Sequence, residues 1–303
     1  MSFFTRVVVA AAESDPVRSV ITRTRAGKAL AGRFVAGDTV DQAIAAARQL
    51  NSAGMEVSLD LLGEEVATSM EVEAALAGYS SCLDRIATEE IRGNISIKLT
   101  QLGLGIDRGL AAAALDRLAA TASSLGRTVS IDMEDSTYTE ATVELYRAAQ
   151  QRHGNLGLAL QAYLFRTPGD LSALAPLGGH LRLCKGAYVE PETVAYTSKP
   201  EVDAAFSRLL SVLMASESVI PAIATHDPRL IEQTRRLATQ RKGRFEFQML
   251  YGVRPQAQRE LVAAGFPVRI YVPYGSCWYP YLVRRLAERP ANLGFFIRAL
   301  LGR

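Results

Sequence analysis

The chain has 303 residues, of which 49% are hydrophobic and 21% charged, and its formal net charge is +3. This composition is that of an ordinary globular protein, and the length fits one α/β barrel of roughly 250 residues with a short extension. The densest basic cluster, "RKGR" at 241–244, is short, so nucleic acid is not expected as a partner.

The cysteine and histidine content argues against a disulfide framework and against a metal site. Cys82, Cys184 and Cys277 form no CxxC pair, and the three histidines are far apart in the chain. Such usage is typical of a reducing compartment. A charge interrupts the N-terminal apolar run "FFTRVVVAA", and no apolar run approaches the roughly 20 residues of a membrane span. We therefore expect a cytoplasmic protein that is soluble, or peripheral at the inner face of the membrane.

Residues 1–34 indicate one or two accessory helices, and from residue 55 onward a strand-plus-helix pattern recurs. Each unit is a short apolar or β-branched run that is followed by a stretch with helical periodicity. Helical candidates include 39–54, 109–126 and 139–154. The eight predicted strands are 55–64, 94–103, 127–135, 156–164, 181–188, 219–227, 245–252 and 268–275.

Eight alternating units predict an α/β fold in which a parallel sheet closes into a (β/α)8 TIM-type barrel. A doubly wound sheet is the alternative, but it usually carries a GxGxxG turn after its first strand, and "LDLLGEE" is different. No linker or low-complexity segment divides the chain. We expect a single domain, 1–303, with the barrel at 55–303.

Polar side chains fall at the carboxyl ends of nearly all the predicted strands, where barrel enzymes carry their chemistry. They are Lys98, Asp132, Gln161, Arg182 with Lys185, Thr225 with His226, Gln248 and Tyr271. Each also has a structural interpretation. Asp132 could cap the next helix or pair with Lys98, the two glutamines could satisfy buried backbone groups, and His226 could be a loop or core residue.

Two further segments indicate ligand binding. In "CKGAY", Gly186 and Ala187 leave room for a flat or phosphate-bearing ligand beside the charge of Lys185. In "PYLVRRLAER", Tyr281, Arg284, Arg285 and Glu288 share one helix face at spacing i, i+3, i+4 and i+7. Two guanidinium groups beside a tyrosine suit a small carboxylate ligand. The alternative is a solvated basic face with one salt bridge.

The segments "SIKLTQLG", "IDMED", "LQAYL", "RLCKGAY", "ATHD", "FEFQMLYG" and "YVPYG…YLVRRLAER" resemble, in order and spacing, those of the proline dehydrogenase family. The resemblance covers roughly residues 33–292 and implies a barrel that holds non-covalent FAD. It also implies oxidation of L-proline to 1-pyrroline-5-carboxylate, the first step of proline degradation to glutamate. A hydride would pass to the flavin and electrons to a quinone, typically in a membrane.

The resemblance also implies roles for individual residues. Asp132 and Arg182 resemble the catalytic carboxylate and the flavin-contacting arginine, and Tyr196 resembles a tyrosine of the closed site. The substrate-binding set implied is Lys98, Tyr271, Tyr281, Arg284, Arg285 and Glu288. The FAD-binding set implied is Met133, Gln161, Leu183, Lys185, Gly186, Ala187, Thr225 and His226. Val189 departs from the family pattern, which often has tryptophan there.

Two alternatives remain open at the level of sequence. One is a Schiff-base aldolase that uses Lys98 or Lys185 as its nucleophile. The other is a barrel that binds a carboxylate without catalysis.

Overall fold

The computed structural model describes residues 22, 24–63 and 66–287. Its eight strands are all parallel and pair in chain order, with β8 returning to β1 to close the barrel. The strands are β1 Glu56–Leu61, β2 Gly93–Ile97, β3 Val129–Ile131, β4 Leu156–Gln161, β5 His180–Cys184, β6 Ile220–Ala224, β7 Glu246–Leu250 and β8 Val268–Tyr274. The predicted barrel and all eight predicted strands are therefore confirmed, and the doubly wound alternative is wrong.

Alternation along the strands separates an apolar outer layer from an interior that is polar in most of them. In β2, for example, Ile95 and Ile97 belong to the main hydrophobic core, which lies between the strands and the helices. Their neighbours Asn94 and Ser96 form hydrogen bonds with the side chains of Ser130 in β3 and Arg182 in β5. Because strand side chains alternate between two faces, the apolar positions build the core and the others line the barrel.

The helices surround the barrel, and most begin at a side chain that satisfies the free N–H groups of the first turn. Thr39 and Thr68 form capping boxes at the starts of two helices. The helices are α3 Arg25–Ala31, α4 Val40–Ser52, α5 Ser69–Thr88, α6 Arg108–Ser124, α7 Ser136–His153, α8 Thr167–Leu174, the 3-10 turn Ala175–Leu177, α9 Lys199–Ala215, α10 Pro228–Ala238, α11 Pro255–Ala263 and α12 Trp278–Ala287. The three helical candidates named from sequence correspond to α4, α6 and α7.

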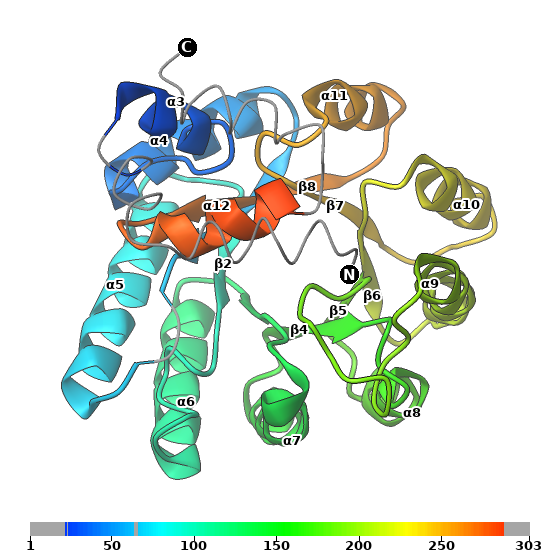
Figure 1. Ribbon diagram of the computed structural model, residues 1–303, viewed down its shortest axis with the longest axis horizontal. Coiled ribbons are helices and arrows are strands. Elements are labelled where there is room, and N and C mark those ends of the chain that lie inside the picture. The colour runs from blue at the N-terminus through cyan, green and yellow to red at the C-terminus, as the bar shows by residue number, and fades with distance from the viewer. Residues whose placement is uncertain (1–21, 23, 64–65, 288–303) are drawn as a thin grey trace.

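The segment before the barrel packs against the helix that follows β8. Within the predicted accessory region 1–34, α3 is described, and residues 1–21 and 23 lie outside the described residues. Leu30 and Phe34 form a second hydrophobic cluster with Trp278 and Leu282 of α12. Figure 1 shows α12 next to α3 and lying across the strands. This packing fixes α12 over the barrel. Among the described helices, none is long and apolar enough to cross a membrane.

Candidate active site

A cavity of about 870 Å³ opens at the carboxyl ends of the strands and under α12. Its size lies within the range of roughly 300–1,000 Å³ that is typical of ligand sites. Most of the residues singled out from sequence line it. They are Lys98, Asp132, Met133, Gln161, Arg182, Lys185, Gly186, Ala187, Thr225, His226, Gln248, Tyr271, Tyr281, Arg284 and Arg285.

Two of the predicted residues do not reach the cavity, and a third cannot be placed. The Leu183 side chain is buried in the core between strands and helices, because Arg182 before it points inward. Tyr196 packs edge-on against Phe165, with ring centroids 4.7 Å apart, and does not line the cavity. Glu288 lies outside the described residues.

Asp132, directly after β3, is the centre of the polar network in the cavity. Its Oδ1 accepts hydrogen bonds from Arg182 and from Ser96, the latter at 2.7 Å. Its Oδ2 accepts a hydrogen bond from the Tyr271 hydroxyl at 2.6 Å. Burial would raise the pKa of Asp132, but Lys98, Arg182 and these hydrogen bonds lower it to about 2. The carboxylate is therefore charged at neutral pH.

The cap of helix α7 is a different aspartate. The side chain of Asp135 accepts a hydrogen bond from the N–H of Thr137, so the interpretation of Asp132 as that cap is wrong.

Lys98 lies between two carboxylates, one of which the sequence interpretation missed. Its Nζ is 3.1 Å from Oδ1 of Asp60 in β1 and 3.4 Å from Oδ2 of Asp132. Burial opposes the charge of Lys98, but Asp60, Tyr271 and Asp132 raise its pKa well above the ordinary value. Burial raises the pKa of Asp60. The signal that would have identified Asp60 is its place in the apolar run "VSLDLL". There it is the polar side chain that the barrel pattern predicts near the end of the first strand.

Arg182 is a second buried cation of the cavity, with 9% of its surface exposed. One terminal nitrogen donates to Asp132 and the other to the Ser96 hydroxyl at 3.1 Å. Its guanidinium carbon lies 5.5 Å from the centre of the Tyr271 ring. The Nε atom is buried and has no hydrogen-bond partner among the described residues. A buried donor of this kind is costly unless a ligand accepts from it.

The loop after β5 contributes both space and charge. Gly186 has φ +118°, and a Cβ there would lie 2.4 Å from the Tyr163 ring, so this turn requires glycine. The Lys185 Nζ is 2.5 Å from Asp203 and 3.0 Å from Asp227. Burial acts to raise the pKa of Asp227, but hydrogen bonds with Lys185 and with the N–H of Arg229 lower it to about 2.

The basic side chains around these carboxylates exceed them in number. Lys199 and Arg229 also pair with Asp203, at 2.5 Å and 2.7 Å. Three cations therefore share two carboxylates at the rim of the cavity, an arrangement suited to an anionic ligand group.

The turn after β6 is fixed on several sides. The Thr225 hydroxyl accepts from the N–H of Asp227 at 3.1 Å, and the side chain of Asp227 caps α10. Nε2 of His226 accepts from the N–H of Leu250 at 3.0 Å. This bond assigns the ring hydrogen to Nδ1, which makes that nitrogen a donor. Gln161 donates to the buried carbonyl of Glu134 at 2.8 Å, as its structural interpretation required, and still lines the cavity.

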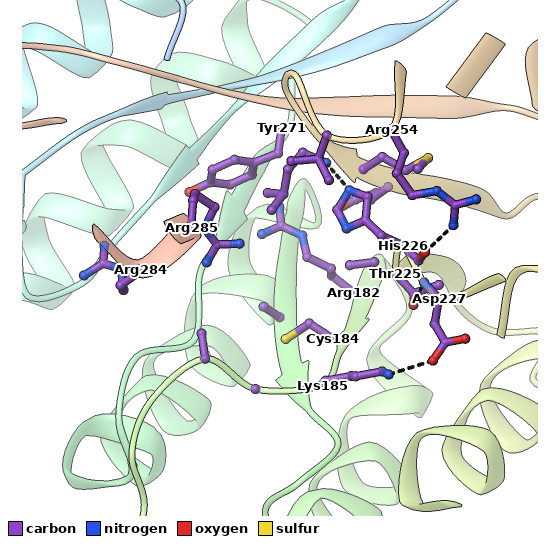
Figure 2. A pocket seen from close by; sticks show the side chains of 18 of the residues that line it. Arg182, Cys184, Lys185, Thr225, His226, Asp227, Arg254, Tyr271, Arg284 and Arg285 are labelled. Atoms are coloured by element: carbon purple, nitrogen blue, oxygen red, sulfur yellow. Dashed lines mark hydrogen bonds and ion pairs between the residues drawn. The ribbon is translucent and has the colours of Figure 1, made fainter. Parts of the chain in front are cut away.

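Helix α12 brings both predicted arginines to the cavity. Arg285 lies over the Tyr281 ring, with its guanidinium carbon 5.3 Å from the ring centre. In Figure 2 the Arg285 side chain extends toward the middle of the pocket near Tyr271, and the Arg284 side chain extends toward its rim. The pocket is thus lined both by the guanidinium pair of α12 and by the Asp132–Arg182 network. Within the described ranges no cluster of three or more His, Cys, Asp or Glu side chains could hold a metal ion.

Comparisons with known proteins show which proteins this chain resembles. The family model described as proline dehydrogenase matches residues 43–298. Proline dehydrogenase 1 of Bacillus subtilis (strain 168) is 38% identical over 274 residues, which cover 89% of this chain and 90% of that protein. Proline dehydrogenase of Deinococcus radiodurans is 37% identical over 280 residues, which cover 90% of each.

The fold is also found in a solved structure of a larger protein. The crystal structure of proline utilization A (PutA) from Bdellovibrio bacteriovorus, inactivated by N-propargylglycine, matches with a TM-score of 0.81 and 24% identity. The match covers 86% of this chain and 33% of that one, so this chain corresponds to about a third of the larger protein.

Proposed function

The chain belongs to the proline dehydrogenase family, and we propose how its cavity carries out the reaction of that family. As a member of the family it is an enzyme that oxidises proline, the first step of proline catabolism. In our proposal the substrate is L-proline, the product is 1-pyrroline-5-carboxylate, and the cofactor is non-covalently bound FAD. FAD supplies the acceptor for the hydride that leaves C5 of proline.

The donor set of the cavity fits the flavin cofactor. The orphaned Nε of Arg182 and the surplus of cations around Asp203 and Asp227 suit an electron-rich ring and phosphate groups. The residues that would hold FAD are Met133, Gln161, Arg182, Lys185, Gly186, Ala187, Thr225 and His226, with Leu183 contributing through its backbone. The charge of Arg182 would stabilise the negative charge that accumulates on a reduced ring.

The substrate would be fixed at its carboxylate by Arg284 and Arg285, with Tyr271 and Tyr281 against its ring. Holding both partners in one geometry provides much of what a protein can add to a hydride transfer. The ring nitrogen must be neutral before the hydride leaves, because its lone pair forms the new C=N bond.

Neither Asp132 nor Lys98 is a good proton acceptor at neutral pH, and Asp60 is not among the residues that line the cavity. Asp132 has a pKa of about 2, and Lys98 stays protonated. We therefore assign the amine proton to water. Asp132 would act by stabilising the positive charge that develops on the nitrogen.

The same electrostatics argue against the aldolase alternative. A Schiff-base lysine has to be neutral to attack a carbonyl group. The pKa of Lys98 is raised well above its ordinary value, and Lys185 is paired with two carboxylates. Lys98 is therefore a poor nucleophile, and the Lys185 amine is occupied by its two ion pairs.

The electron acceptor and location are further parts of the proposal. We propose a quinone as the acceptor of electrons from the reduced flavin. Because quinones reside in membranes, the enzyme would be in peripheral contact with the inner face of the membrane. It would work in the cytoplasm as one barrel domain.

The observation that carries the proposal is the meeting of the Asp132–Arg182 network and the α12 arginines in one cavity. The test is the visible spectrum of the purified protein without oxygen. We expect a yellow protein whose flavin absorbance is bleached by L-proline, with a weaker response at equal proline concentration in Arg285→Met. A colourless protein in which borohydride traps a substrate on lysine would show the proposal to be wrong, as would a flavin that L-proline does not reduce.

A further inference from the structure

Arg254 combines an unusual backbone conformation with a contact to the turn after β6. It is the residue before α11 and has φ 52° and ψ 53°, the left-handed region that side-chain-bearing residues adopt rarely. It also precedes Pro255, and a residue before proline is normally extended. Such conformations persist where the surrounding structure holds them, and they are frequent at functional sites.

The side chain of Arg254 reaches from the β7–α11 loop to the neighbouring turn. Its Nη1 donates to the carbonyl oxygen of His226 at 2.6 Å, as Figure 2 shows. Thr225 is held by Asp227 of its own turn, and Asp227 also caps α10 and pairs with Lys185 of the loop after β5. For His226, by contrast, the ring is held by the N–H of Leu250 at the end of β7, and the carbonyl by Arg254.

The loop that carries Arg254 is itself fixed at both ends. Gly252 has φ +71°, and a Cβ there would lie 1.6 Å from the carbonyl oxygen of Arg33, so the loop runs directly against the segment before the barrel. On the other side, Gln258 of α11 donates to the carbonyls of Leu250 and Val253 at 3.0 and 2.9 Å. The left-handed Arg254 is therefore held in a rigid frame.

We propose that Arg254 is a positioning residue for the cofactor: it holds the Thr225–His226 turn in the conformation that binds FAD. The inference rests on the proposed FAD site. The Arg254 side chain acts through the His226 backbone, so its removal should weaken FAD binding and leave the proline clamp on α12 unchanged. The left-handed conformation of Arg254 costs free energy because the residue carries a side chain, and this cost lowers the stability of the apoprotein. Glycine at this position would adopt the same φ without strain.

The test measures the dissociation constant of FAD for the apoprotein, the proline KM of the FAD-saturated enzyme, and the Tm of the apoprotein. Loss of a charge-assisted hydrogen bond predicts that Arg254→Met raises the FAD dissociation constant about tenfold. We expect proline KM to change by less than about twofold. Arg254→Lys, which keeps a donor of similar length, should recover part of the affinity.

Arg254→Gly separates positioning from general stability. It removes the guanidinium group and the strain together, so the apoprotein Tm should stay level or rise while FAD affinity falls. The matched control is Glu90→Gly, because Glu90 is exposed, has φ 52°, and follows α5 away from the cavity. That control should raise the Tm of the apoprotein and leave the FAD dissociation constant at the wild-type value.

Two results would overturn the inference. One is an unchanged FAD dissociation constant in Arg254→Met or Arg254→Gly, and the other is a raised proline KM with normal FAD affinity. If the wild-type protein binds no FAD at all, the proposed function fails first. The wild-type titration therefore distinguishes failure of the cofactor proposal from failure of the role of Arg254.

Discussion

The two ends of the barrel each bury an arginine beside carboxylates, but they use the guanidinium group differently. At the N-terminal end, Arg269 donates to Glu246 at 2.8 Å, to Glu56 and to the carbonyl of Val57 at 3.0 Å. All three of its nitrogens have partners. At the carboxyl end, Arg182 leaves Nε without a partner among the described residues.

This difference separates a structural charge cluster from one that can act on a ligand. Every guanidinium nitrogen of Arg269 donates to a carboxylate or a carbonyl group of the protein. Its end of the barrel does not contribute to the cavity. Arg182 and Lys98 are buried to a degree comparable to Arg269, yet they line that cavity together with Asp132. A buried ion pair is therefore weak evidence for function by itself, and what matters is the hydrogen-bonding capacity left over toward an open space.

The largest expected effect is a loss of stability at the N-terminal end of the barrel, called the closed end below because the cavity opens at the opposite end. Arg269→Met leaves Glu246 buried without its cation, and loss of one partner of a buried pair costs about 3–5 kcal/mol. Urea unfolding should show this loss, while proline KM of the folded enzyme stays normal. Arg244→Met, at an exposed residue, is the control and should change stability by less than about 0.5 kcal/mol. A change in KM without a loss of stability would break the comparison.

The next effect is at the carboxyl end of the barrel, called the open end because the cavity opens there, and it concerns the α12 arginines. Arg284→Met or Arg285→Met should raise proline KM by about 10- to 100-fold, since each removes a charge-assisted contact with the carboxylate. Flavin content and unfolding free energy should remain near those of the wild type. Steady-state kinetics with a flavin assay measures both. Loss of flavin with unchanged proline affinity would contradict the assigned roles.

At the open end, the charge of Asp132 should make the free energy of unfolding depend on pH in the acid range. Folding lowers the pKa of this group from 3.8 to about 2, so its charged form stabilises the native protein at neutral pH. This contribution, of order 2 kcal/mol, is fully present above about pH 4 and is lost as the pH falls toward 2. Asp132→Asn should lose about 1 kcal/mol less than the wild type between pH 7 and pH 3 in urea unfolding. An identical acid dependence in the two proteins would contradict this assignment.

The smallest expected effect compares two buried serines. Ser58 in β1 donates to Asn94 at 2.5 Å, whereas Ser96 in β2 donates to Asp132 and accepts from Arg182. Each change to alanine should cost about 1 kcal/mol of unfolding free energy. We expect kcat to fall a fewfold in Ser96→Ala and to stay constant in Ser58→Ala. Equal kcat values in the two variants would show that the hydrogen bonds of Ser96 matter no more for catalysis than those of Ser58.

Sequence patterns predicted the barrel well because each strand and helix carries a local signal. The run "MEVSLDLLGE" predicted β1, yet Asp60 within it was overlooked, although the rule that identified Asp132 applies to it as well. Strand alternation would likewise have placed the Leu183 side chain in the core once Arg182 was assigned to the interior.

Other features of the site depend on contacts that no local pattern contains. The left-handed Arg254 lies in a loop that packs at Gly252 against Arg33, and these two residues are distant in the chain. Arg182 and Arg269 are both strand arginines, and their different hydrogen-bond partners come from strands far away in sequence. Tertiary structure alone decides which of them keeps a donor for a ligand.

The closure of the barrel also sets an order of assembly. Arg269 of β8 and Glu56 of β1 pair across 213 residues, at the seam where the last strand meets the first. Contacts of such long range form late, because much of the chain has to be ordered before they become favourable. During synthesis, strands β1 to β7 emerge before the seam can close. Helix α12 follows β8, so the arginine clamp is also completed last. A ribosome-bound chain would therefore gain proline affinity only after the seam has closed and α12 has packed over the barrel.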